Sequence, residues 1–466
     1  MVLLLITSCS NVENKMESMI PDNAVVVAKV DVPTLMGNLK VEFKDGKMVL
    51  PEKFAQMLEK NGMNLTKDSD KLMDSGIDFT SSLYFFMPDD KEPSMVALVP
   101  VSDPEKLKKF LSEEENATFE AKGGMEVASK AGMGYVINDG IMFVTQSGDP
   151  AATVSSLASL AKNMGDNKSM VRALDSGDDI NVYINTKRLK ELAGSELAGR
   201  SGNSDMARML FDLMDIKSTA LHLSLADGQW RIGVDNEVDE NGDYAKLIQS
   251  VTTKPSAELL AYMPKAGNMG VLNFNINGEG ILNLDMVKPL LAEVAGNPEM
   301  SQMIDIFKSV KGPVTLGVAS SSLNPEELDG ALAFKCGKSR ELVALVKQMF
   351  PGMYTQNGDE CVLNEKMQGF DATLGIKGDV VYIKMTHNNY SDNMASVSDA
   401  KDVIGRAMCG GFLTLSVDNM QMQLTYDGRN IKQGSLTMWV KENGKKLSPL
   451  DALTFFEHFE DLQRKL

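Results

Sequence analysis

Histidine is scarce in this sequence, and its cysteines are few and widely separated. The chain of 466 residues has three histidines and four cysteines. No two histidines have the i, i+4 or HExxH spacing of a helical metal site, and no two cysteines form a CxxC motif. We therefore predict no metal-ligating residue and no cofactor. The residues concerned are His222, His387, His458, Cys336, Cys361 and Cys409, with Cys9 alone near the N-terminus. Whether two of the three C-terminal cysteines form a disulfide is left open by the sequence.

Basic residues and long apolar runs are also scarce. Lys and Arg number 47 against 64 Asp and Glu, which gives a formal net charge of −17. An acidic surface repels phosphate backbones, so nucleic acid is not expected as a partner, although solubility alone also explains such a charge. No run of about 20 apolar residues is present, and a membrane-spanning helix is therefore not expected.

Catalytic motifs are incomplete throughout. There is no GxSxG nucleophile elbow. Residues 336–339, Cys-Gly-Lys-Ser, end like a P-loop, but Leu332 stands where that motif requires glycine. We read Lys338-Ser339 as the start of a helix. An EF-hand loop that began at Asp239 would have Tyr244 and Ser250 where glycine and glutamate are required, so a solvated turn explains the acidic run 235–243 better. We predict no catalytic residue.

Methionine, by contrast, is abundant at 32 residues. The methionines are spread along the chain, which favours a role as pliable core residues over copper binding or a binding surface. Met57, Met142 and Met349 stand at positions expected in a core. Met420 and Met422 alternate on a predicted strand and should share one face.

The N-terminus, Met1-Val-Leu-Leu-Leu-Ile-Thr-Ser-Cys9, is similar to a bacterial lipoprotein signal. In that pattern Ile6 to Cys9 form the lipobox, and Cys9 becomes the acylated first residue. Acyl chains anchor a protein because each buried CH₂ adds about 0.8 kcal/mol of membrane affinity. No basic residue precedes the apolar run, so the true start can lie upstream of Met1, and a buried strand of a cytosolic fold is the alternative. We predict that residues 1–18 are a signal remnant and tether.

The rest of the chain repeats itself at an offset of roughly 230–245 residues. A proline turn with an alternating strand, a strand followed by an amphipathic helix, a hairpin and a late strand each occur twice, in the same order. Asp103-Pro104 and Asp149-Pro150 are typical of helix starts. Glycine-containing hairpin turns are predicted at residues 138–140, 377–379, 227–228 and 427–428.

Strands and hairpins dominate, without regular βαβ crossovers. We therefore predict an α+β fold of two tandem, internally duplicated domains, residues 19–252 and 253–466. Each should be a mostly antiparallel sheet with helices packed on one face.

With its Cys-terminated leader, its entry segment Ile20-Pro-Asp-Asn-Ala-Val-Val-Val27 and its duplicated α+β body, the chain resembles the uncharacterised Bacteroidales lipoproteins called domain of unknown function 4836. The resemblance implies an envelope lipoprotein and carries over no catalytic residue.

These observations favour a non-enzymatic binding or scaffold lipoprotein in the cell envelope, held in the outer membrane through lipidated Cys9, with a protein or glycan partner. Whether it faces the periplasm or the exterior is left open. The alternative is a hydrolase or glycan-active enzyme with its site in the cleft between the domains.

Overall fold

The computed structural model divides into two compact units. Unit 1 comprises Met1–Asp212, Ile216–Glu237 and Lys446–Glu457, and unit 2 comprises Leu213–Asp215, Val238–Lys445 and His458–Leu466. Compared with the predicted domains, residues 238–252 fall in unit 2 and residues 446–457 in unit 1. The structure describes residues 12–44, 47–60, 71–89, 95–197, 215–264, 268–285, 287–294, 296–320, 327–364, 370–387 and 398–463.

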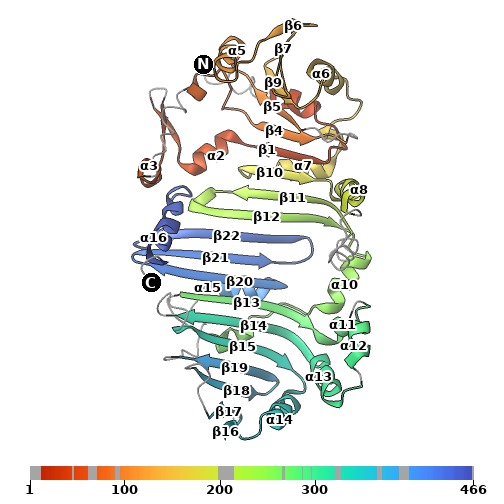
Figure 1. Ribbon diagram of the computed structural model, residues 1–466, viewed down its shortest axis with the longest axis vertical. Helices are drawn as coiled ribbons and strands as arrows, with labels where there is room; N and C mark the ends of the chain where they lie inside the picture. Colours follow the sequence, from red (N-terminus) through yellow and green to blue (C-terminus); the bar gives the residue numbers. More distant parts are fainter. Residues whose placement is uncertain are drawn as a thin grey trace. The chain divides into compact units, whose positions relative to one another are not determined.

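Unit 1 is built on an antiparallel sheet (Figure 1). Its strands are β1 (Val26–Val30), β4 (Leu83–Met87), β5 (Val96–Pro100), β6 (Glu120–Lys122), β7 (Met125–Lys130), β8 (Met133–Asn138), β9 (Ile141–Thr145), β10 (Ile180–Ile184), β11 (Ile216–Ser224) and β12 (Gln229–Val238). The pairings follow the order β11-β10-β1-β4-β5-β9-β8-β7-β6. A separate hairpin joins β2 (Glu42–Lys44) and β3 (Lys47–Val49).

Helices cover both faces of this sheet. The helices of unit 1 are α2 (Val32–Leu39), α3 (Glu52–Lys60), α5 (Pro104–Glu114), α6 (Pro150–Ala158), α7 (Lys168–Leu174) and α8 (Thr186–Leu197), with short 3₁₀ turns η1 (Met164–Asp166), η2 (Ala226–Gly228) and η5 (Asp451–Leu453). Phe143 enters one core with α6 and α7, whereas Met142 enters another with α5. Successive strand residues point to opposite faces, so a strand that is apolar at consecutive positions buries both faces. The prediction of helices on one face was therefore wrong.

Local signals for helix starts and turns are confirmed in unit 1. The carboxylate of Asp103 accepts hydrogen bonds from the backbone N–H groups of Glu105 and Lys106, and that of Asp149 accepts one from Ala152. The hairpin between β8 and β9 turns at Asp139-Gly140, where both residues have positive φ. This is the geometry that a two-residue hairpin requires.

The strands of unit 2 are also paired antiparallel. They are β13 (Asn268–Asn277), β14 (Val310–Ser320), β15 (Asp329–Cys336), β16 (Tyr354–Asn357), β17 (Glu360–Leu363), β18 (Asp371–Lys377), β19 (Val380–Thr386), β20 (Cys409–Val417), β21 (Met420–Gly428) and β22 (Gln433–Glu442). The pairings follow the order β22-β21-β20-β13-β14-β15-β19-β18-β17-β16. The predicted turn at residues 427–428 was wrong, because β21 continues through Gly428 to pair with Cys409.

Helices also lie on both faces of the unit 2 sheet. The helices of unit 2 are α10 (Asp243–Val251), α11 (Gly278–Leu282), α12 (Lys288–Val294), α13 (Pro298–Lys308), α14 (Ser339–Met349) and α15 (Ser398–Arg406), with the 3₁₀ turn η3 (Glu258–Tyr262). The last elements of the chain are β23 (Lys445–Lys446) and α16 (Thr454–Gln463). Ala333 and Tyr382 pack with η3 and α15 on one face. Phe334 and Val381 pack with α13 and α14 on the other. Among the described residues, the helices on this second face pack against the end of the sheet that contains Val310 and Cys336.

The two units share a strand order. We number the strands of each unit along the chain and leave out the β2–β3 hairpin. In both units the first strand then lies between the second and the eighth. The third strand pairs with the seventh in both, as β5 with β9 and β15 with β19. Both sheets therefore belong to a mixed α+β architecture with antiparallel pairing.

Candidate functional site

The residue predicted to be lipidated, Cys9, lies outside the described residues, so its modification stays a prediction. No helix in the described part of the chain combines the length and apolar character needed to cross a bilayer.

His222 takes a structural position in unit 1. Its Nδ1 lies 2.8 Å from Oδ1 of Asn181 on β10, and its Nε2 lies 3.3 Å from Asp235 on β12. The ring thus bridges three strands from its place on β11. Across the ranges that the structure describes, no three His, Cys, Asp or Glu side chains are grouped to hold a metal ion.

The three C-terminal cysteines are free thiols. Cys336 and Cys361 are buried, while Cys409 is half-buried, and burial raises the pKa of the Cys409 thiol. The helix predicted to begin at Lys338-Ser339 is confirmed as α14, and Lys338 pairs with Asp305 of α13. The Cys-Gly-Lys-Ser sequence is therefore a helix start joined to its neighbouring helix.

The methionine predictions are confirmed in part. Met142, Met420 and Met422 are buried, and the last two share a face of β21. Met349 is 47% exposed at the end of α14, so its assignment to a core was wrong.

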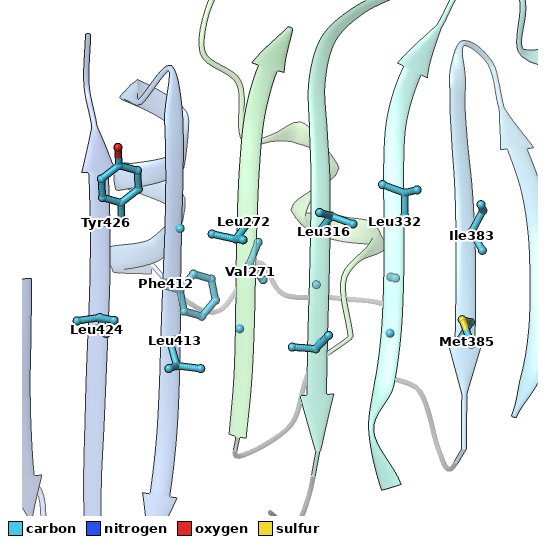
Figure 2. A pocket seen from close by; sticks show the side chains of 16 residues that line it. Val271, Leu272, Leu316, Leu332, Ile383, Met385, Phe412, Leu413, Leu424 and Tyr426 are labelled. Carbon is cyan, nitrogen blue, oxygen red and sulfur yellow. The ribbon is translucent and has the colours of Figure 1, made fainter. Parts of the chain in front are cut away.

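A hollow of about 600 Å³ opens on one face of the unit 2 sheet, and we call it the apolar hollow (Figure 2). It extends across β21, β20, β13, β14, β15 and β19. Its volume lies within the range of ~300–1,000 Å³ that is usual for ligand pockets. The lining residues are Gly270, Val271, Leu272, Leu316, Gly317, Val318, Gly330, Ala331, Leu332, Ile383, Met385, Gly411, Phe412, Leu413, Leu424 and Tyr426.

Most of these side chains form two rows that run across the strands, because directly paired residues of antiparallel strands point to the same face. The glycine row contains Leu424, Leu413, Gly270, Val318, Gly330 and Met385. The leucine row contains Tyr426, Gly411, Leu272, Leu316, Leu332 and Ile383. Figure 2 shows Leu272, Leu316, Leu332 and Ile383 following one another on adjacent strands.

The two rows leave large apolar side chains open to solvent. Leu272, Leu316 and Val318 are between 43% and 48% exposed, and Met385 and Tyr426 are 40% and 42% exposed. Next to the leucine row, Phe334 and Val381 on the same face are packed under α14. The sheet face thus changes from helix-covered to open within a few residues.

A polar network on the opposite face of the sheet fixes which side chains of β13 point toward the apolar hollow. Asn273 and Asn275 of β13 and Thr315 of β14 are at most 1% exposed. The Asn275 amide donates to the carbonyl of Ala407, just after α15, and its Oδ1 accepts from the backbone N–H of Ser256. Because the asparagines are held inward, Leu272 and Phe274, which alternate with them along β13, must point outward.

None of the described residues that line the apolar hollow carries a charge. Tyr426 supplies a phenolic hydroxyl, and burial, with Cys409 and Asp427 nearby, raises the pKa of Tyr426, so the phenol stays neutral. Asp427 alternates to the opposite face, where its Oδ2 accepts from Arg406 and Arg429 at 2.9 and 3.1 Å. The described lining is therefore apolar apart from the Tyr426 hydroxyl, which is its one titratable side-chain group.

Sequence reasoning did not identify any residue of the apolar hollow. The signal was present in β13, where residues 272–276 alternate Leu, Asn, Phe, Asn and Ile. Such a pattern normally places the apolar residues inward. A glycine within an otherwise apolar strand, as at Gly270 and Gly330, was the second available signal.

Comparison with known proteins places most of the chain in one family. A family model described as "Domain of unknown function (DUF4836)" matches residues 16–385. Three crystal forms of TP0453 are similar in structure, each with a TM-score of 0.29 and with 9%, 10% and 11% sequence identity. They cover 47–48% of this chain and 78–79% of TP0453. No curated protein matches the chain.

Proposed function

The chain belongs to the family named for domain of unknown function 4836, and from that premise we propose that it is a lipid-anchored envelope protein that binds an apolar ligand in the apolar hollow of unit 2. Cys9 is the proposed anchor. The Bacteroidales origin and the outer-membrane location stay predictions, and the membrane face that it occupies is left open.

The observation that carries the proposal is the open row of large apolar side chains around a hollow of about 600 Å³. Leaving Leu272, Leu316 and Val318 more than two-fifths exposed costs stability relative to burying them. A ligand that covers them recovers that free energy, which gives the site its affinity.

We further propose that the two units are copies of one duplicated domain. The shared strand order supports this, including the first strand placed between the second and eighth and the third paired with the seventh. The apolar hollow lies wholly within unit 2, so binding is assigned to that copy.

A hydrolase or glycan-active enzyme remains the alternative function, and the apolar hollow does not support it. Carboxylates, histidines and thiols are missing from the sixteen residues that line it. A glycan would also need several hydrogen-bonding partners, whereas the Tyr426 hydroxyl is the one side-chain polar group among these residues.

Binding of the apolar dye N-phenyl-1-naphthylamine to the purified chain tests the proposal, since its fluorescence rises in an apolar site. Leu316→Glu places a carboxylate in the hollow and should weaken binding at least tenfold. Ile232→Glu is the matched control, because Ile232 is 47% exposed on β12 of unit 1 and does not line the hollow. Equal binding by both variants, or no dye binding by the parent chain, would contradict the proposal.

A further inference from the structure

The first helix that the structure describes, residues 12–18, belongs to the core of unit 1. Met16 on this helix and Ile20 just after it are fully buried. The hydroxyl of Tyr84 on β4 donates a hydrogen bond of 2.7 Å to Oε1 of Glu17. Releasing the helix would expose two large apolar side chains and leave the Tyr84 hydroxyl without its acceptor. The helix is therefore fixed to the sheet of unit 1.

The chain enters unit 1 at one particular end of β4. Glu13 Oε1 accepts a hydrogen bond of 3.1 Å from the backbone N–H of Ser82, the residue before β4 begins. Farther along the chain, the backbone N–H of Val25 donates to the carbonyl of Met87, the last residue of β4. The segment that connects these two contacts thus follows β4 from its start to its end. We call the end of the sheet where β4 starts the Ser82 end.

The turn between β8 and β9 also lies at the Ser82 end. β5 pairs antiparallel with both β4 and β9, so the starts of β4 and β9 lie beside the end of β5. Asp139 in that turn lies 3.8 Å from Nζ of Lys15 on the first helix. The turn at Ala131 is at the other end of β8, and the six residues of that strand separate the two turns by roughly 20 Å at ~3.3 Å per residue. The two turns therefore mark opposite ends of the sheet.

A short connection joins the first helix to the proposed anchor. Only Ser10 and Asn11 stand between Cys9 and Val12. Three backbone steps of ~3.3–3.6 Å span at most about 11 Å in any conformation. The headgroup layer of one bilayer leaflet is about 5–8 Å thick. Acyl chains on Cys9 would therefore keep Val12 within a few ångströms of the headgroups.

Resting on the proposed anchor at Cys9, we propose that this short connection holds the Ser82 end of unit 1 against the lipid headgroups. The surface of contact is made by the start of the first helix, the segment before β4 and the turn at Asp139. The turn at Ala131, at the far end of β8, lies away from the bilayer. A longer connection would let unit 1 leave the surface, because the r.m.s. span of a flexible linker of n residues grows as ~5–6 Å × √n.

Fluorescence quenching from the headgroups tests the inference. The acylated full chain is reconstituted in phosphatidylcholine vesicles that contain a lipid with a nitroxide on its headgroup, which quenches only at short range. Bimane is attached to Asp139→Cys in one sample and to Ala131→Cys in the other. The two positions are matched, because both residues are exposed and both precede a glycine in a turn, with φ of 49° and 50°.

Cys409→Ser is included in both chains, because that thiol is half-buried, whereas Cys336 and Cys361 are buried. Thermal unfolding verifies that the labelled chains are folded. We expect the label at position 139 to be quenched at least threefold more strongly than the label at position 131. A spacer of about ten Gly and Ser residues between Ser10 and Asn11 should keep the chain in the membrane fraction and lower the quenching at position 139 to the value at position 131.

These results separate the inference from the proposed anchor. If the chain fractionates with membranes but the two labels are quenched equally, the inference is overturned and the anchor stands. Strong quenching at position 139 that persists with the spacer would also overturn it, because a contact other than the short connection would then hold unit 1 on the headgroups. If the chain is not acylated and stays soluble, the anchor and the inference fail together. The dye measurement on the apolar hollow is independent of each result.

Discussion

Thr315 Oγ1 donates a 2.7 Å hydrogen bond to Oδ1 of Asn273, directly across the pairing of β14 with β13. Both side chains are buried, on the face of the sheet opposite the apolar hollow. The amide of Asn273 also lies 3.4 Å from the carbonyl of Ser256. A buried polar pair thus determines which face of β13 receives its apolar residues, and the apolar hollow exists because Leu272 has no place in the core.

We expect Asn273→Ala to destabilise unit 2 by about 1–3 kcal/mol, because it leaves the buried Thr315 hydroxyl without its acceptor. Thr315→Val should cost a similar amount by leaving Asn273 Oδ1 without a donor. The double variant should cost less than the sum of the two. Urea unfolding followed by Trp439 fluorescence measures this, because Trp439 lies on β22 of unit 2 and the other tryptophan, Trp230, can be replaced by Phe. Additive effects would contradict a direct coupling.

The surroundings of two glycines in unit 2 predict that replacing each by alanine has a different effect on stability. A Cβ on Gly280, in α11, would collide with the backbone carbonyl of Ser250, and backbone cannot move aside cheaply. A Cβ on Gly330 would meet open space. Gly280→Ala should therefore lower the free energy of unfolding by about 1–3 kcal/mol.

Gly330→Ala should leave that free energy nearly unchanged. The same Trp439 signal compares the two variants, and equal unfolding midpoints would show that the close approach at Gly280 relaxes without cost.

The sequence predicts local structure well because helix caps and hairpin turns depend on a few neighbouring residues. Asp103-Pro104 and Asp139-Gly140 each satisfy their own backbone geometry, and both predictions are confirmed. Which side chains of β13 point into the core was not predictable in this way. Its inward asparagines are satisfied by Thr315 and by the carbonyl of Ala407, which lie 42 and 132 residues away in sequence. The open face therefore depends on tertiary partners that alternation within one strand does not reveal.

Acid should weaken unit 1 partly through Glu237. The hydroxyls of Ser169 and Ser218 donate hydrogen bonds of 2.7 and 3.0 Å to the Glu237 carboxylate. These bonds oppose its protonation and lower the pKa of Glu237 from its ordinary value of 4.5, and the bond from Ser169 is the larger cause. A carboxyl group with a lowered pKa in the folded state stabilises the fold above its unfolded pKa. That contribution is lost as the pH falls through the folded value.

Ser169→Ala should therefore flatten the decline in stability below pH 4.5 more than Ser218→Ala does. Unfolding followed by Trp230, in a chain with Trp439→Phe, reports on unit 1 between pH 3 and pH 6. A decline of unchanged steepness in Ser169→Ala would show that Glu237 does not contribute to the acid sensitivity.

Cys9 provides the prediction on cellular location. If it is acylated, the wild-type chain should fractionate with membranes, and Cys9→Ser should release it to the soluble fraction, because each buried CH₂ of an acyl chain adds about 0.8 kcal/mol of affinity. Cys409→Ser is the matched control, since that half-buried thiol lies within β20 and should not affect fractionation. A soluble wild-type chain would contradict the anchor. A Cys9→Ser variant that stays in the membrane fraction would show that another contact, with the exposed face around Leu316 as the first candidate, holds the protein there.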